Sequence, residues 1–259
     1  MKKYLADLIV SSNEKLHPNY CLLKLTQNTP LPDMLPGQFV EIKVENSSTT
    51  FLRRPISINY VDKEKNELWL LIQIVGDGTL KLSELKEGNM VNLMYPLGNS
   101  FTIPKRNNSK KMLLIGGGVG TAPMLFLGAE LKKLGHEPVF LLGAKTSEDL
   151  LQLYTFRQLG IVHTTTEDGS AGEKGYVTDH TIMQKADFEM IYTCGPKPMM
   201  MAVAKYAKKY GIPCEVSLEN LMACGIGACL CCVENTIDGH ICACIEGPVI
   251  NVEKLTWQI

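Results

Sequence analysis

The chain has 259 residues and a formal net charge of -1, with 45% hydrophobic and 20% charged residues. This composition is typical of a globular protein with a substantial core, and the small net charge excludes a global field that would attract nucleic acid or an anionic membrane. No segment approaches the roughly 18 consecutive apolar residues of a membrane span. The apolar run near the N-terminus is interrupted by Asp7 and lacks a signal-peptide cleavage site. We therefore expect a cytoplasmic protein that binds neither nucleic acid nor a membrane.

The first hundred residues predict an antiparallel β-domain. Runs rich in β-branched, Leu and aromatic residues lie at 20–27, 38–44, 53–61 and 67–75. Turn segments containing Pro, Gly and Asn separate them, which is typical of an antiparallel barrel or sandwich. One short helix is expected over 79–88, where a glycine ends the helical pattern.

The polar stretch at 105–111 predicts a crossing into a second domain. Beyond it, strands at 112–115, 138–145 and 188–194 are each followed by a helical pattern. This alternation predicts a doubly wound parallel sheet covered by helices on both faces. The cysteine-rich tail is too short to form an independent core. We expect domains at 1–104, 105–212 and 213–259.

A glycine turn after the first strand of this second domain predicts a nucleotide site. Gly117, Gly118 and Gly120 have no Cβ, so the backbone can approach a pyrophosphate closely, and the following helix start offers free N–H groups. Thr121 is expected to cap that helix. Pro123 stands where the dinucleotide fingerprint has its third glycine, so a simple tight turn is the alternative interpretation.

A second loop of the same kind follows a later strand. Its residues are Cys194, Gly195 and Pro196. Loops at the carboxyl ends of strands form the ligand crevice of a doubly wound sheet, so two of them favour a nucleotide. Glu148 and Asp149 follow the middle strand with no arginine nearby for a 2′-phosphate, which favours NAD over NADP, although Lys145 leaves NADP open.

The β-domain contains its own candidate anion site. In the stretch FLRRPISINY, Arg54 offers a forked donor for a phosphate and Ser57 a hydroxyl for a flavin ring atom. A solvated arginine pair on a strand edge is the alternative. Gly78 and Thr79 place further N–H groups at a helix start. One anion site in each domain predicts two nucleotides that meet at the interface.

The chain has nine cysteines, an odd number in a protein expected to face a reducing compartment. Disulfides are rare there, so clustered thiols indicate a metal site. Six of the nine lie between 222 and 249. The other three, Cys21, Cys194 and Cys214, are interpreted as ordinary buried thiols.

The clustered cysteines have the spacing of an iron–sulfur site. Cys224, Cys229 and Cys232 follow the pattern C-x4-C-x2-C with a more distant cysteine beyond, as in plant-type [2Fe–2S] ligation. By spacing alone the fourth ligand is Cys242 or Cys244. One or both of the two glycines within the first gap are expected to adopt positive φ so that the loop can wrap. Zinc is the alternative metal, but structural zinc sites usually draw ligands from two short knuckles.

The whole chain resembles the electron-transfer subunits of type B dihydroorotate dehydrogenases, within the ferredoxin–NADP reductase superfamily. The resemblance rests on RRPISI, LIQIVGDGT, PLGNSF, GGGVGTAPM, CGPKPMM and, most specifically, SLENLMACGIGACLCC with CIEGPV. It implies FAD contacts at Arg54, Pro55, Ile56, Ser57, Leu71, Ile72, Gln73, Gly78 and Thr79. It implies NAD contacts at Gly117, Gly118, Gly120, Thr121, Cys194, Gly195 and Pro196. It implies cluster ligands at Cys224, Cys229, Cys232 and Cys244.

The same resemblance selects Cys244 over Cys242, because the family's last ligand precedes an acidic-Gly-Pro-Val segment. Two features depart from the family, namely the short loop between Cys232 and Cys244 and the extra Cys242. Both concern the fourth ligand and leave the other three unaffected.

The resemblance implies an electron relay. FAD would occupy the β-barrel, NAD(H) the parallel-sheet domain and a [2Fe–2S] cluster the C-terminal domain. A hydride carries two electrons and a cluster accepts one at a time, so the flavin must lie between them. The implied partner is an FMN-containing catalytic subunit that oxidises dihydroorotate to orotate in pyrimidine synthesis, in a heterotetramer with two copies of each subunit. No residue of this chain is expected to act as a general acid or base.

Two other functions fit the same motifs. One is a related flavin/iron–sulfur NAD(P)H oxidoreductase subunit that feeds ferredoxin, sulfur or hydrogenase chemistry. The other is a zinc-stapled binding module without redox activity. A visible absorption spectrum distinguishes the second, because zinc and an empty nucleotide fold are colourless.

Overall fold

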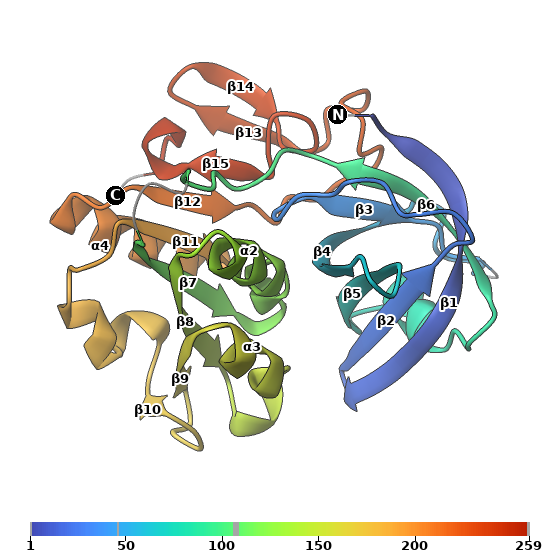
Figure 1. Ribbon diagram of the computed structural model, residues 1–259. Helices are drawn as coiled ribbons and strands as arrows, with labels where there is room; N and C mark the ends of the chain where they lie inside the picture. The colour runs from blue at the N-terminus through green and yellow to red at the C-terminus, as the bar shows by residue number, and fades with distance from the viewer. Residues whose placement is uncertain (1, 46, 106–108, 258–259) are drawn as a thin grey trace.

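The first hundred residues close into an antiparallel barrel in the computed structural model, which describes residues 2–45, 47–105 and 109–257. The strands are β1 (Tyr4–His17), β2 (Tyr20–Thr26), β3 (Phe39–Ile42), β4 (Arg54–Asp62), β5 (Glu67–Gln73) and β6 (Met90–Leu97). They follow the order β1-β2-β5-β4-β3-β6 around the barrel (Figure 1). Alternate side chains, among them Leu23, Ile58 and Leu70, fill its interior. The predicted β-barrel is confirmed.

The barrel includes two strands that the sequence did not predict, β1 and β6. β1 contains the polar run SSNEK and is largely half-exposed or exposed, so its hydrophobic alternation is weak. β6 lies between a turn and the segment PLGNSF and continues up to Leu97. The helix predicted at 79–88 is shorter and begins two residues earlier than expected. α1 spans Asp77–Ser83, and residues 85–88 are not helical.

The second sheet runs in the order β10-β9-β8-β7-β11-β12-β15. Its strands are β7 (Lys111–Gly117), β8 (Glu137–Ala144), β9 (Ile161–Thr166), β10 (Glu173–Lys174), β11 (Met190–Cys194), β12 (Cys214–Ser217) and β15 (Val249–Asn251). All neighbours are parallel except β15, which runs antiparallel to β12. This confirms the predicted parallel sheet.

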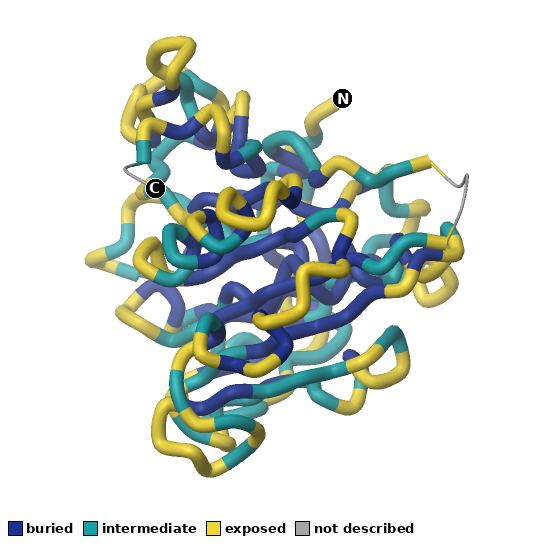
Figure 2. The backbone as a smooth tube through the Cα atoms, turned by 90° about the vertical axis from the view of Figure 1, so that its left-hand side faces the viewer, coloured by how far each residue is buried: buried dark blue, intermediate teal, exposed yellow. Residues whose placement is uncertain are grey.

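Helices cover both faces of this sheet, as a doubly wound fold requires. α2 (Ala122–Lys133) and α3 (Leu153–Leu159) pack with Leu114 of β7, whereas α4 (Lys197–Tyr210) packs with Leu113 from the opposite face. The sheet is therefore buried throughout its centre, as Figure 2 shows, and exposed residues are concentrated in loops and edges. Among the described residues no helix is long and apolar enough to cross a bilayer.

The cysteine-rich tail is joined to this sheet. Its first strand β12 pairs with β11 and its last strand β15 pairs with β12, while β13 (Val233–Thr236) and β14 (Gly239–Cys242) form a separate hairpin. Both sheet strands lie beyond residue 213, where we placed the start of the third domain. The other predicted crossing, at 105–111, includes residues 106–108, which lie outside the described residues. The domain limits stay predictions.

The barrel and the parallel sheet share a packed interface built on α2 and β4. Asn59 of β4 donates to the Ala122 carbonyl at 3.0 Å and exchanges two amide hydrogen bonds with Gln152, at 3.1 and 3.0 Å. The ring of Phe126 from α2 meets Tyr60 edge-on, with centroids 6.0 Å apart. These contacts hold the two domains in one fixed arrangement.

Replacing Asn59 with Ala tests this interface. Asn59 is completely buried, so the variant leaves the Gln152 amide without its partner and should lose about 1–3 kcal/mol of unfolding free energy. Urea denaturation of the purified protein measures the loss. Gln158→Ala, which removes an exposed amide from α3, is the matched control and should unfold like the native chain. Equal stability of the two variants would contradict the assigned role of the amide pair.

Candidate cofactor sites

The two predicted nucleotide loops lie together at the topological switch point of the sheet, where the order in which strands are added reverses. The chain runs outward from β7 to β8 and later returns to β11 on the other side of β7, so the loops after β7 and β11 flank the switch point. A Cβ on Gly120 would lie 2.4 Å from the Cys194 carbonyl oxygen, and one on Gly195 would lie 3.0 Å from the Gly117 oxygen. These glycines therefore let the two loops touch. Gly118, with φ +56° and open space before it, offers free backbone to a ligand.

Thr121 does not cap α2 in the expected way. It occupies the N-cap position, but its hydroxyl donates to the Gly118 carbonyl at 3.0 Å and accepts no backbone N–H. The reason is local, because Gly118–Thr121 forms a 3₁₀ turn that directs the hydroxyl back along the chain. Pro123 lies in the first helical turn, as expected.

A hollow of about 260 Å³ opens beside the second loop. It is lined by Gly195, Lys197, Met200, Leu218, Glu219, Asn220, Glu234 and Trp257. At its edge the buried Cys194 thiol donates to a Glu219 carboxylate oxygen at 3.8 Å, and burial raises the pKa of Cys194. The pKa of Glu219 is also raised, chiefly by partial desolvation within the hollow, although the residue is exposed overall.

Sequence reasoning missed Glu219. Glu219 lies two residues beyond the end of β12, a strand that the sequence analysis did not predict, so no local signal indicated it. The buried thiols themselves were predicted correctly, since Cys21, Cys194 and Cys214 are each 1% exposed.

The barrel brings together two of the predicted FAD segments. A Cβ on Gly78 would lie 3.0 Å from Thr50 and 3.4 Å from the Arg54 side chain. The start of α1 therefore packs against both residues. The Arg54 guanidinium bonds only to the Leu52 carbonyl among the described residues, which leaves other donors of its fork unused. Thr79 is already engaged, because its hydroxyl accepts from the two N–H groups that precede α1.

The remaining predicted FAD residues lie in different surroundings. Ile72 is fully buried in the barrel interior, and Leu71 packs against α2 at the domain interface. Gln73 donates to the Tyr20 hydroxyl at 3.1 Å. Pro55, Ile56 and Ser57 lie half-buried on β4 next to β3. Among the described residues the Ser57 hydroxyl has no hydrogen-bond partner, so it remains available to a ligand.

The cysteine loop is shaped around its sulfur atoms. The backbone N–H groups of Ile226, Ala228 and Cys229 donate to the Cys224 sulfur at 3.5, 3.3 and 3.4 Å. These donors, that of Ile226 foremost, lower the pKa of the Cys224 thiol to about 6. The two glycines in the first gap have φ of +65° and +79°, as predicted. Inward N–H groups are what a thiolate-bound cluster requires, so the loop fits an iron–sulfur group.

The four predicted ligands fall into two pairs. The Cys229 N–H donates to the Cys224 sulfur at 3.4 Å, and the Cys244 N–H donates to the Cys232 sulfur at 3.4 Å. Each iron of a two-iron cluster takes two thiolates, so the pairs match its two metal ions. Burial raises the pKa of Cys244 to about 12. Among the described residues no three His, Cys, Asp or Glu side chains group around a single-ion site.

Cys244 and Cys242, the two candidates for the fourth ligand, differ in their surroundings. Cys244 is buried, and its sulfur accepts the Gly227 N–H at 3.2 Å from the far side of the loop. Cys242 is half-buried at the end of β14, and its own N–H is taken by the Glu246 carboxylate at 2.8 Å. The Cys244 sulfur thus accepts an N–H from the loop that carries the other three cysteines, whereas Cys242 packs beside Cys232 and its sulfur accepts no such hydrogen bond among the described residues.

The cysteine segment is fastened to the barrel. Cys232 and Cys244 pack in a small buried cluster with Phe39 of β3 and Leu97 of β6. Below it, Asn99 donates to the Val249 carbonyl at 2.9 Å and accepts the Val249 N–H at 3.0 Å. The PLGNSF and CIEGPV segments, far apart in the sequence, are therefore in direct contact.

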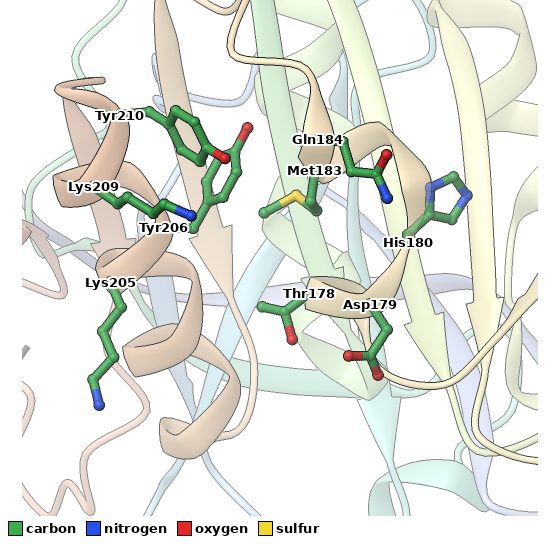
Figure 3. Close-up of a pocket in the computed structure, with 9 residues that line it drawn as sticks. All are labelled: Thr178, Asp179, His180, Met183, Gln184, Lys205, Tyr206, Lys209 and Tyr210. Atoms are coloured by element: carbon green, nitrogen blue, oxygen red, sulfur yellow. The ribbon is translucent and has the colours of Figure 1, made fainter.

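A second hollow, of about 310 Å³, lies away from all predicted site residues. In it Lys205, Tyr206, Lys209 and Tyr210 of α4 face Thr178, Asp179, His180, Met183 and Gln184, as Figure 3 shows. It is the larger hollow, yet none of the predicted cofactor residues lines it.

The barrel, the switch-point loops and the cysteine loop define a flavin- and iron–sulfur-dependent NAD(P)H oxidoreductase of the ferredoxin-reductase type. The NADH-dependent reduced ferredoxin-NADP oxidoreductase studied for flavin-based electron bifurcation has a similar structure, with a TM-score of 0.86 and 29% identity over 97% of this chain and 90% of that one. The FAD/NAD-binding domain of a Vibrio cholerae nitric oxide dioxygenase shares the fold, with a TM-score of 0.69 and 19% identity over 81% of this chain and 97% of its own.

Family models and curated relatives identify the family. Residues 219–256 match the iron-sulfur cluster binding domain of dihydroorotate dehydrogenase B, and residues 114–205 match the oxidoreductase NAD-binding domain. The dihydroorotate dehydrogenase B (NAD(+)) electron transfer subunit of Shouchella clausii is 38% identical over 85% of this chain and 86% of its own. That of Fusobacterium nucleatum is 34% identical over 94% and 95%. The chain belongs to this family of electron transfer subunits, and its cofactors are FAD, a [2Fe–2S] cluster and NAD(H).

Replacing Gly227 with Ala tests the preformed cysteine loop. A Cβ there would lie 2.4 Å from the Ile245 side chain, and the left-handed backbone adds about 1–2 kcal/mol of strain. We expect purified G227A to hold much less iron and acid-labile sulfide per chain than the native protein. Gly211→Ala, at φ +65° with open space around it, carries the backbone strain without the clash and should keep its cluster. Full cluster content in G227A would refute the loop geometry.

Proposed function

We propose that this chain passes electrons between NAD(H) and an FMN-containing dihydroorotate dehydrogenase catalytic subunit, in a cytoplasmic heterotetramer with two copies of each. In the complete reaction dihydroorotate loses two electrons and two protons to become orotate, while NAD⁺ gains a hydride and one proton is released. The relatives' name, electron transfer subunit, supports a separate catalytic partner. The reaction would serve pyrimidine synthesis.

The observation that carries this proposal is that the three cofactor sites share structural elements. The cysteine cluster packs on Phe39 of β3, and Phe39 pairs directly with Ser57 of β4. On its other side β4 packs against α2, the helix that begins at the switch-point loop. A single chain of contacts thus joins the three sites, as a relay over short distances requires.

Several of the predicted site residues would then have a binding role. Cys224, Cys229, Cys232 and Cys244 would hold the cluster in the two pairs described above. The unused donors of Arg54 would bind the FAD pyrophosphate, and the Ser57 hydroxyl would face the flavin ring. The open backbone at Gly118 would receive the NAD pyrophosphate. When bound, the flavin supplies the exchange between hydride and single-electron transfer, and the protein supplies position and electronic tuning.

The partner should dock where the cysteine loop meets solvent. Leu221 and Leu230 are 84% and 63% exposed on either side of the first cysteines, and Ile226 and Ile245 are also exposed. Exposed apolar side chains gathered on one segment are typical of a protein interface. Docking there would bring the acceptor close to the cluster and exclude water from it.

Reconstitution with an FMN-containing, dihydroorotate-oxidising subunit tests the function. The purified complex should form NADH and orotate in equal amounts from NAD⁺ and dihydroorotate, and neither subunit alone should do so. A complex that assembles with all its cofactors but produces no NADH would exclude the proposed acceptor.

Leu230→Asp tests the docking face. Leu230 has φ +59°, which aspartate tolerates better than leucine, so the change should not harm the fold. A buried charge at the interface should weaken subunit affinity by about tenfold or more, measured by titration calorimetry. Tyr154→Asp, at an exposed position on α3, is the control and should bind like the native chain. Native affinity in L230D would place the interface elsewhere.

A second candidate is a subunit that feeds ferredoxin. The structure of the NADH-dependent reduced ferredoxin-NADP oxidoreductase, which is 29% identical to this chain, favours it. NADH-dependent reduction of a ferredoxin by the purified chain, without turnover alongside the FMN subunit, would support this alternative. A colourless protein containing zinc would instead indicate the non-redox module.

A further inference from the structure

A buried acidic side chain, Glu41, faces the cysteine loop from the barrel. Glu41 lies on β3, where Val40 and Ile42 point into the barrel, so Glu41 and Phe39 point outward. It is nevertheless 0% exposed, because the cysteine loop covers it. A Cβ on Gly225 would lie 2.7 Å from its Cγ and 3.2 Å from its Oε1. The carboxyl group therefore ends directly beneath the residue that follows Cys224.

Both oxygens of this carboxyl group lack a hydrogen-bond partner among the described residues. The two nearby arginines do not supply one. Arg53 donates to the main-chain oxygen of Glu41 and to Asn92, while Arg54 donates to Leu52. A buried polar group without a partner costs about 1–3 kcal/mol, and an unpaired buried charge costs more. The arrangement therefore points to a partner supplied by the group that the cysteine loop holds.

The neutral acid is the form that fits this environment. Burial is the largest influence on the carboxyl group and raises the pKa of Glu41 to about 7, against the opposing charges of Arg53 and Arg54. A neutral carboxyl group carries one O–H donor. The loop that covers Glu41 is the one predicted to hold the cluster, and the sulfurs of such a cluster accept hydrogen bonds.

We propose that Glu41 is a positioning residue whose carboxyl O–H donates a hydrogen bond to a sulfur atom on the Cys224 side of the cluster and thereby raises the cluster's reduction potential. The inference rests on the proposed iron–sulfur site. Hydrogen bonds to the sulfurs are one of the means by which a protein sets such a potential, because they stabilise the more negative reduced form. Glu41 would do so from β3, on the side of the cluster that faces the FAD-binding strand β4.

Two substitutions of similar size distinguish a hydrogen-bond donor role of the Glu41 side chain from an effect of its negative charge. Glu41→Gln keeps an N–H donor, whereas Glu41→Leu removes it. The readout is the midpoint potential of the cluster in the purified flavoprotein, titrated at one fixed pH and followed by electron paramagnetic resonance. We expect E41L to shift to lower potential and E41Q to stay near the native value. Glu87→Gln, which removes an exposed carboxylate from a turn, should also stay native.

Two results would overturn the inference. Native potentials in both E41L and E41Q would show that Glu41 does not act on the cluster, and a shared upward shift would show that it acts as a charge. Iron, sulfide and flavin content are measured on every sample. Native protein without iron or sulfide would refute the cluster site itself, whereas full clusters with unshifted potentials would refute only the role of Glu41. If E41L loses its cluster, the E41Q result decides between donor and charge.

Discussion

The burial of both faces of one short strand, β3, is the constraint on which the rest of the molecule depends. Val40 and Ile42 point into the barrel, and Phe39 and Glu41 point outward beneath the cysteine segment. A strand on a barrel surface normally leaves its outer face to solvent or to a neighbouring domain. Here the cysteine loop covers that face, so the cluster site and the barrel form one packed unit.

This packing explains why the tail needs no core of its own. β12 and β15 extend the parallel sheet. Asn99, in the segment that follows β6, exchanges two hydrogen bonds with the Val249 backbone and so holds the CIEGPV segment against the barrel. The cysteine segment is therefore held by two larger domains at once. Asn59 of β4 donates to Ala122 of α2, and Tyr60 of β4 packs on Phe126 of α2, so α2 joins the two domains. The three proposed cofactor sites are therefore fixed relative to one another. Electron transfer needs fixed separations between cofactors, and this secondary-structure packing would provide them.

Much of this architecture could be predicted from the sequence, for identifiable reasons. Strands β2 to β5 and the alternation of strands and helices follow from hydrophobic periodicity. The cysteine spacing and its two glycines are local features, so their conformation could also be anticipated. By contrast, β1 and β6 were missed because their patterns are weak, and the capping role of Thr121 failed because a 3₁₀ turn intervenes. Glu41 and Glu219 gain their significance only from long-range contacts, which a linear sequence does not display.

The central claim is that NADH, FAD and the cluster are electronically connected within this one chain. Anaerobic addition of NADH to the purified subunit, without any partner, tests it most directly. We expect the flavin absorbance to bleach and the paramagnetic signal of a reduced [2Fe–2S] cluster to appear in the same sample. Bleaching of the flavin while the cluster remains fully oxidised, even with excess NADH, would contradict it.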